Sequence, residues 1–134
     1  MGGAVFVDSS ALYALFDADD SGHETTARLW ERLVSEDHPL FVTNYVLLET
    51  SALLQRRLGV EAVRALEVFV VPWLNVTWID GVLHAQAVAA LLAANRRDLS
   101  LVDCTSFSAM RRAGISTVLG LDGHFVEQGF SEFA

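Results

Sequence analysis

The stretch that decides the fold of this 134-residue chain lies near its start and reads Ala4-Val5-Phe6-Val7-Asp8-Ser9-Ser10. Its first four residues are apolar and rich in valine, which is typical of a buried strand. The strand pattern ends at Asp8, and helical spacing begins directly at Ser9 and continues to Phe16. A buried strand that leads at once into a helix indicates the first unit of an α/β fold.

The same alternation continues along the rest of the chain. Short apolar runs predict further strands at residues 40–42, 76–79 and 116–121, with a short edge strand at 130–133. Helical spacing predicts helices over residues 23–34, 44–58, 60–71, 82–95 and 102–112. Strands that alternate with helices are typical of a parallel sheet in an α/β sandwich. A chain of this length without a Pro- or Gly-rich linker is expected to form one domain, residues 1–134.

The amino-acid composition and the N-terminus indicate in which cellular compartment the protein works. Hydrophobic residues make up 52% of the chain, yet no apolar run is long enough to span a bilayer. The N-terminus lacks the basic segment of a signal peptide and leads straight into the first strand. The single cysteine, Cys104, excludes an internal disulfide and a multi-cysteine zinc site. We therefore expect a cytoplasmic protein without membrane contact.

The charged residues exclude several chemistries. All nine basic residues are arginines, against 17 acidic residues, for a net charge of −8. Without lysine, the chain has neither the phosphate-binding lysine of a P-loop nor the amine of a Schiff-base enzyme. An acidic chain also argues against nucleic-acid binding, because phosphate contacts normally come from a basic face. That objection weakens if the carboxylates are gathered where they bind a cation.

Four acidic residues stand out by their positions. Asp8 and Asp122 each follow an apolar strand pattern, and Asp103 lies where a helix begins. Glu49 lies within a helix and shares a face with apolar residues. Taken singly, Asp8 and Asp103 could be helix caps and Asp122 a turn residue. Glu49 fits such a role less well, because an acid on an apolar face needs a partner.

Together the four acids suggest a metal site. If strand ends and helix starts converge, carboxylates about 4 Å apart repel by roughly 4 kcal/mol at an effective dielectric near 20. That repulsion is tolerable when some groups are protonated or when a cation lies between them. Oxygen ligands without His or Cys favour Mg²⁺ or Mn²⁺ over zinc, and such ions support phosphodiester hydrolysis.

Four motifs carry a family resemblance, and they occur in order over essentially the whole chain. They are Phe6-Val7-Asp8-Ser9-Ser10, Asn44-Tyr45-Val46-Leu47-Leu48-Glu49, Leu99-Ser100-Leu101-Val102-Asp103-Cys104-Thr105-Ser106-Phe107 and Leu121-Asp122-Gly123-His124-Phe125. Each resembles the corresponding motif of the PIN-domain nucleases, and the third is close to a form common in VapC-like toxins. The fourth motif departs mildly, with Gly120 where threonine is frequent and Gly123 where a basic residue is frequent.

The resemblance implies a three-layer α/β/α sandwich with a central, mostly parallel sheet. It further implies an endoribonuclease that uses Mg²⁺ or Mn²⁺ to hydrolyse RNA and acts as the toxin of a toxin–antitoxin pair. The metal-binding and catalytic acids would be Asp8, Glu49, Asp103 and Asp122, with Ser10 supporting Asp8 through a hydrogen bond. The implied partners are the RNA substrate, a VapB-like antitoxin and a second copy of the chain in a homodimer.

Two other functions fit the same motifs. One is a PIN-like module that binds RNA or protein and has little catalytic activity, and the other is a metal-dependent DNA nuclease. His23 and His124 lie beside acidic residues, and we expect both to be satisfied surface or core histidines. The pairs Arg56-Arg57, Arg96-Arg97 and Arg111-Arg112 lie at predicted helix ends. They are either solvated helix termini or contacts to RNA phosphates around the acidic residues.

Overall fold

The computed structural model describes residues 2–134, and within them one five-stranded sheet forms the centre of the molecule. Its strands follow the order β3-β2-β1-β4-β5, and each neighbouring pair is parallel. The strands are β1 (Val5–Val7), β2 (Leu40–Thr43), β3 (Leu74–Thr77), β4 (Thr117–Leu119) and β5 (Ser131–Glu132). The predicted parallel sheet is therefore confirmed, with β1 as its central strand.

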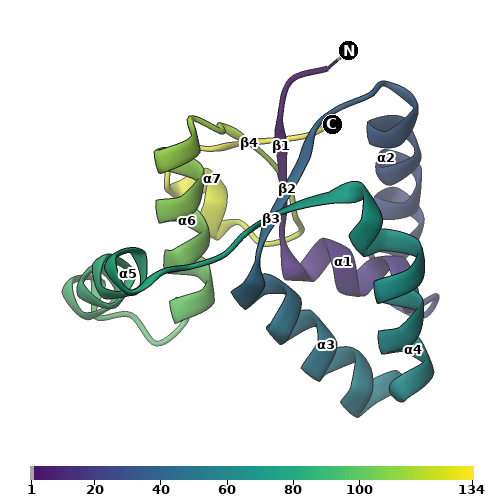
Figure 1. Cartoon of the computed structure of the whole chain (residues 1–134), viewed down its shortest axis with the longest axis horizontal. Helices are drawn as coiled ribbons and strands as arrows, with labels where there is room; N and C mark the ends of the chain where they lie inside the picture. Colours follow the sequence, from purple (N-terminus) through teal and green to yellow (C-terminus); the bar gives the residue numbers. More distant parts are fainter. Residues whose placement is uncertain (1) are drawn as a thin grey trace.

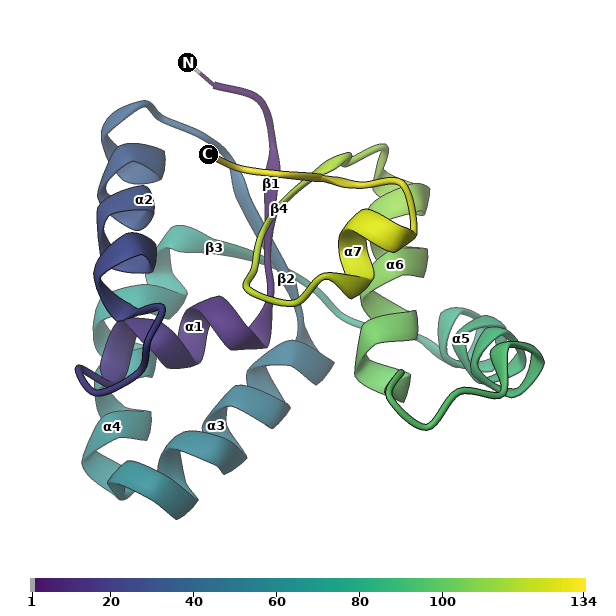
Figure 2. The same ribbon diagram turned by 180° about the vertical axis from the view of Figure 1, so that it is seen from behind.

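Helices cover the sheet on both sides (Figure 1). On one side lie α1 (Ser9–Phe16), α2 (His23–Ser35), α3 (Asn44–Leu58) and α4 (Val60–Ala65). On the other lie α5 (Gly81–Ala94), α6 (Leu101–Ala113) and α7 (His124–Glu127). Seen from behind in Figure 2, α5 stands apart from the sheet and packs mainly against α6. The arrangement is the expected three-layer α/β/α sandwich.

Burial explains why the opening stretch is so apolar. Val5, Phe6 and Val7 are all at most 1% exposed, because β1 has a strand on each side and helices on both faces. On the α6 and α7 side, the Phe6 ring meets a cluster of aromatic rings centred on Phe125, which is fully buried. Both helical layers therefore pack against the central strand. Asp8 follows its last residue, Val7, and lies at the edge of the core.

Four elements differ from the prediction by more than one residue. The strand expected at 116–121 is limited to β4 (Thr117–Leu119), and the short helix α7 (His124–Glu127) is absent from the predicted elements. The helix expected over residues 60–71 is regular only to Ala65; it continues as a π-helical turn, η1 (Leu66–Val70), and a 3₁₀ turn, η2 (Val71–Trp73). Pro72 does not end the helical path, because a proline in the first turn of a 3₁₀ segment needs no hydrogen-bond donor. The strand expected at 76–79 both begins and ends two residues earlier, at Leu74–Thr77. It begins earlier because Leu74 already pairs with Leu40 of β2, and beyond its end the amide of Ile79 donates to the side chain of Asn44 instead of to a strand.

The order of the strands places a crevice at one edge of the sheet. From β1 the chain moves outward through β2 to β3, and then crosses to β4 on the other side of β1. The direction of winding therefore reverses between β1 and β4. In open α/β sheets, ligands bind outside the carboxyl ends of the strands at such a reversal. Asp8 follows β1 at this point, and Asp122 follows β4 three residues after its end.

Candidate active site

A cavity of about 450 Å³ opens at this edge of the sheet, and all four predicted acids line it. Asp8 comes from the end of β1, Glu49 from α3, Asp103 from the first turn of α6, and Asp122 from the loop after β4. The remaining lining residues are Ser9, Ser10, Tyr13, Asp20, Ser21, Leu53, Ser100 and Leu121. The structure thus brings together acids that are up to 114 residues apart in the sequence.

Asp8 is the buried member of the group. It caps α1, and its Oδ2 accepts hydrogen bonds from the Ser10 hydroxyl at 2.9 Å and more weakly from the Ser10 amide. Its other oxygen, Oδ1, is buried and has no hydrogen-bond partner within residues 2–134. Burial raises the pKa of this carboxyl from 3.8 to about 6; the Ser10 hydroxyl opposes the rise, and the charge of Asp103 adds to it.

Ser10 connects the two strands that flank the cavity. Its hydroxyl donates to Asp8 and accepts from the backbone N–H of Leu121 at 3.0 Å, which fixes the loop after β4 against the start of α1. Gly120 lies in that loop, and a β-carbon there would stand 3.2 Å from Cβ of Asp8. The close approach explains why a glycine fits this position, where the resembled motif frequently has threonine. The predicted support of Asp8 by Ser10 is present in the structure.

Glu49 and Asp103 are each held by a serine. The carboxylate of Glu49 accepts a hydrogen bond from the Ser9 hydroxyl, a partner that the sequence did not reveal. Asp103 forms a capping box with Ser100: its backbone N–H donates to the Ser100 hydroxyl, and its carboxylate accepts from the Ser100 N–H at 3.1 Å. Burial raises the pKa of the Asp103 carboxyl, the Ser100 contacts lower it, and the charge of Asp122 raises it further. The capping role and the place in the cavity therefore coexist.

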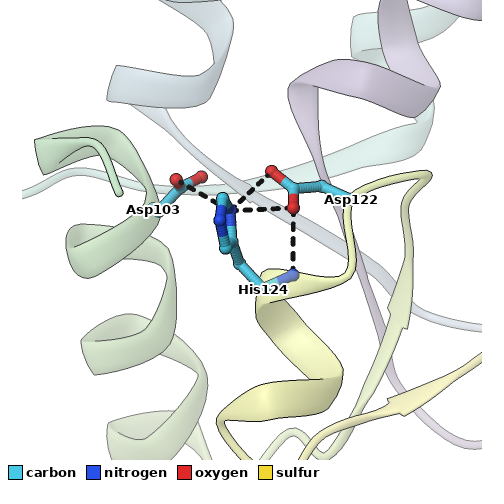
Figure 3. A group of neighbouring side chains, drawn as sticks. All are labelled: Asp103, Asp122 and His124. Atoms are coloured by element: carbon cyan, nitrogen blue, oxygen red, sulfur yellow. Dashed lines mark hydrogen bonds and ion pairs between the residues drawn. The ribbon is translucent and has the colours of Figure 1, made fainter. Parts of the chain in front are cut away.

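His124 is hydrogen-bonded, as predicted, but its partners include an acid of the site, and its ring lies between Asp103 and Asp122 (Figure 3). Its Nδ1 is 2.8 Å from Asp122 Oδ1 and 3.6 Å from Asp103 Oδ2, while Nε2 is 3.2 Å from Asp98 Oδ2. Partial burial lowers the pKa of the imidazole, but hydrogen bonds to Asp98 and Asp122 outweigh that effect and raise it. The available signal was its spacing, two residues after Asp122 at the start of a short helix. His23, by contrast, bonds only to the Ala14 carbonyl, as predicted.

The donor atoms fit a divalent cation. Asp103, Asp122 and His124 each offer one ligand atom, and these atoms lie within 4.8 Å of one another. The unpartnered oxygen of Asp8 adds a buried carboxylate group that a cation would satisfy. Four carboxylates form a set of hard oxygen ligands, which divalent ions such as Mg²⁺ prefer. The structure therefore contains an acidic cluster that could bind a divalent metal ion.

The model of one protein family, the PIN domain, matches residues 5–130. The chain belongs to the PIN domain family. The chain is 38% identical, over 129 residues and 96% of both sequences, to the 23S rRNA-specific endonuclease VapC20 of Mycobacterium tuberculosis. The crystal structure of that protein, described as a sarcin-ricin loop cleaving toxin, has a TM-score of 0.86 and 36% identity, and the match covers 97% of this chain and 98% of the other.

A more distant structure has the same fold. FitAcB from Neisseria gonorrhoeae has a TM-score of 0.69 at 14% identity, with 97% of this chain and 96% of the other covered. At that identity the likeness concerns the fold alone. The predicted PIN-type resemblance is thus confirmed, and with it the α/β fold and membership of a family of nucleases that hydrolyse phosphodiester bonds. Within residues 2–134, no helix is long and apolar enough to cross a membrane.

Proposed function

We propose that this chain is a metal-dependent endoribonuclease that acts as the toxin of a toxin–antitoxin pair. The observation that carries the proposal is the convergence of Asp8, Glu49, Asp103 and Asp122 on one cavity at the reversal of strand order. A buried carboxylate oxygen without a partner is costly in the native state unless a ligand satisfies it. Such a site suits metal-dependent chemistry, which argues against a module that only binds RNA or protein.

Each acid is oriented by a neighbour of its own. Ser10 holds Asp8, Ser9 holds Glu49, and the backbone of Ser100 holds Asp103. Such hydrogen bonds fix ligating carboxylates before a metal binds, and they reduce the reorganisation that binding requires. The fourth acid, Asp122, accepts both from the backbone N–H of His124 and from its imidazole.

The four acids would hold Mg²⁺ or Mn²⁺, because carboxylate oxygens dominate the donor set. A bound divalent ion lowers the pKa of a coordinated water and stabilises negative charge on the phosphate. The protein itself provides the shape of the cavity and keeps the Asp8 side chain out of bulk water. Its negative charge becomes compatible with RNA only after a cation is bound, so RNA affinity should depend strongly on divalent metal.

RNA is favoured over DNA as the substrate because the relative in M. tuberculosis, with 38% identity over nearly the whole chain, is named as an rRNA endonuclease. Large-subunit rRNA is therefore the first substrate to test. The inhibitory partner would be a VapB-like antitoxin, as in the VapC-like proteins that the motifs resemble. The two alternatives, a DNA nuclease and a binding module without catalysis, are distinguished by the same assay.

A homodimer is part of the proposal, and the exposed apolar residues around α5 support it. Trp78, Val82 and Leu92 are each at least two-thirds exposed on or next to this helix, which packs mainly against α6. A second copy that covers this surface would remove it from water. Light scattering on the purified protein should give twice the mass of the chain, and Leu92→Glu should shift the mass toward that of one chain.

The decisive assay compares cleavage of an rRNA fragment and of a DNA strand of matched sequence, with Mg²⁺, with Mn²⁺ and with EDTA. We expect cleavage of the RNA only, and only with a divalent ion. Glu49→Gln should abolish it, whereas Glu61→Gln, which alters an exposed acid paired with Arg64, should not. Cleavage that survives EDTA or Glu49→Gln would contradict the proposal, and preferential DNA cleavage would favour the alternative nuclease.

A further inference from the structure

The arginines of this chain are its only permanently cationic side chains, and five of the nine already contact other side chains of the chain. Four form ion pairs with carboxylates of the same chain, and another donates to the Gln128 side chain and lies over the Phe130 ring. They are Arg32, Arg64, Arg96 and Arg112, and then Arg111. An arginine bound to its own carboxylate must give up that contact before it can bind a phosphate.

Arg57 differs from these arginines because the residue that it contacts, Tyr13, lines the cavity. It lies in the last turn of α3, and its guanidinium carbon is 5.4 Å from the centre of the Tyr13 ring. Tyr13 lines the cavity together with Asp8 and Glu49. Within residues 2–134, Arg57 forms no ion pair at or below 4.0 Å, and its side chain is exposed. It is therefore a cationic group beside Tyr13 at the acidic cavity, close enough to the Asp17 carboxylate for their charges to interact but without an ion pair to it.

The Tyr13 ring on which Arg57 lies is held in place by burial and by a hydrogen bond. Tyr13 is almost fully buried, and its hydroxyl donates to Asp17 Oδ2 at 2.6 Å. The other oxygen of Asp17 accepts from the backbone N–H of Asp19 at 3.0 Å, so the acceptor is itself held by its turn. A guanidinium that stacks on a fixed ring keeps its N–H groups free at the edges and loses less conformational entropy when it binds an anion.

Arg57 and Glu49 lie on the same helix, α3, but not at the same point along it. Eight residues separate it from Glu49, which corresponds to about 12 Å of helix at 1.5 Å per residue. An RNA strand whose scissile phosphate lies among the four acids would bring a flanking phosphate toward the end of α3. At that end of α3 an arginine follows the acidic residues, so a flanking phosphate would meet a cationic side chain there.

We propose that Arg57, held on the Tyr13 ring, binds an RNA phosphate that flanks the scissile one and thereby positions the strand across the acidic cavity. The inference rests on the proposed nuclease function and adds a substrate-binding residue to it. The neighbouring Arg56 provides the matched comparison, since it carries the same charge, is exposed, and lies on the same helix turn. If the two arginines only stabilised the C-terminal end of α3, replacing either one would have the same effect on RNA binding.

The test compares Arg57→Ala, Arg57→Lys and Arg56→Ala with the wild-type chain on the same rRNA fragment with Mg²⁺. For Arg57→Ala we expect KM to rise about tenfold or more while kcat stays close to that of the wild type. The KM of Arg57→Lys should lie between those of the wild type and of Arg57→Ala, because lysine keeps the positive charge but cannot stack a planar group on the Tyr13 ring. Arg56→Ala should change KM by less than about twofold. Equal effects of the two alanine variants, or a fall in kcat alone, would overturn the inference.

Binding without cleavage keeps this test separate from the proposed function. In a Glu49→Gln background with Mg²⁺, the dependence of RNA affinity on salt should lose about 0.7 from its logarithmic slope when Arg57 is replaced, the value for one single-strand phosphate contact. An unchanged slope would refute the Arg57 contact even if the wild-type chain cleaves RNA. A wild-type chain that binds RNA with this Arg57 dependence but never cleaves it would refute the nuclease instead.

Discussion

Asp8→Asn should stabilise the metal-free protein at neutral pH while abolishing its nuclease activity. The Asp8 side chain is 2% exposed, and its pKa is raised from 3.8 to about 6, first of all by burial. Between these two pKa values the folded state binds more protons than the unfolded state, so stability falls as pH rises from about 4 to about 6. At about 1.4 kcal/mol per pKa unit, the cost of the ionised carboxylate above pH 6 is about 3 kcal/mol.

Asparagine removes this cost and keeps an oxygen that can accept from Ser10. We therefore expect Asp8→Asn to unfold with a free energy up to about 3 kcal/mol above that of the wild type at pH 7 in EDTA. Near pH 4, where Asp8 is protonated in the folded chain, the two proteins should have nearly equal stability. Mg²⁺ should then stabilise the wild type more than the variant, because a ligand stabilises only the state that binds it.

Urea denaturation followed by circular dichroism, at pH values from about 4 to about 8 and with EDTA or Mg²⁺, measures these differences. Asp19→Asn is the control, since it removes the same charge from an exposed turn residue. The control should follow the wild-type pH profile throughout. If Asp8→Asn were less stable than the wild type at pH 7 in EDTA, or showed the same profile, then the buried carboxylate would not carry the cost that its burial implies.

Three further variants test the surroundings of the acids and the core. Ser9→Ala removes the hydroxyl that donates to Glu49, so single-turnover cleavage should slow about ten- to a hundredfold; an unchanged rate would show that Glu49 needs no support. His124→Ala removes the imidazole beside Asp122, and calorimetry should show weaker Mn²⁺ binding, whereas wild-type affinity would exclude a positioning role. Phe125→Ala empties a fully buried position, so urea denaturation should show a loss of about 3–5 kcal/mol.

The sequence by itself determined the local elements and the identity of the four acids. The apolar run before Asp8 predicts a buried strand because only side chains that avoid water suit a central strand of a parallel sheet. The cap before α5 is local in the same sense, since the side chain of Asp80 accepts from the N–H of Leu83 three residues later. Such features depend on residues a few positions apart, so a pattern in the sequence is enough to reveal them. The exceptions are residues 60–73, where the hydrophobic spacing did not show the change of helix type, and the short helix α7, which no pattern in the sequence predicted.

Only the tertiary structure decided how these elements meet. The reversal of strand order between β1 and β4 places Ser10 against the amide of Leu121, 111 residues away, and no local pattern encodes that contact. The contacts of His124 and Arg57 became visible in the same way, because their neighbours lie on other elements. A side chain's pKa, partners and function depend on the charges and burial around it in space, and packing brings those together from distant parts of the chain.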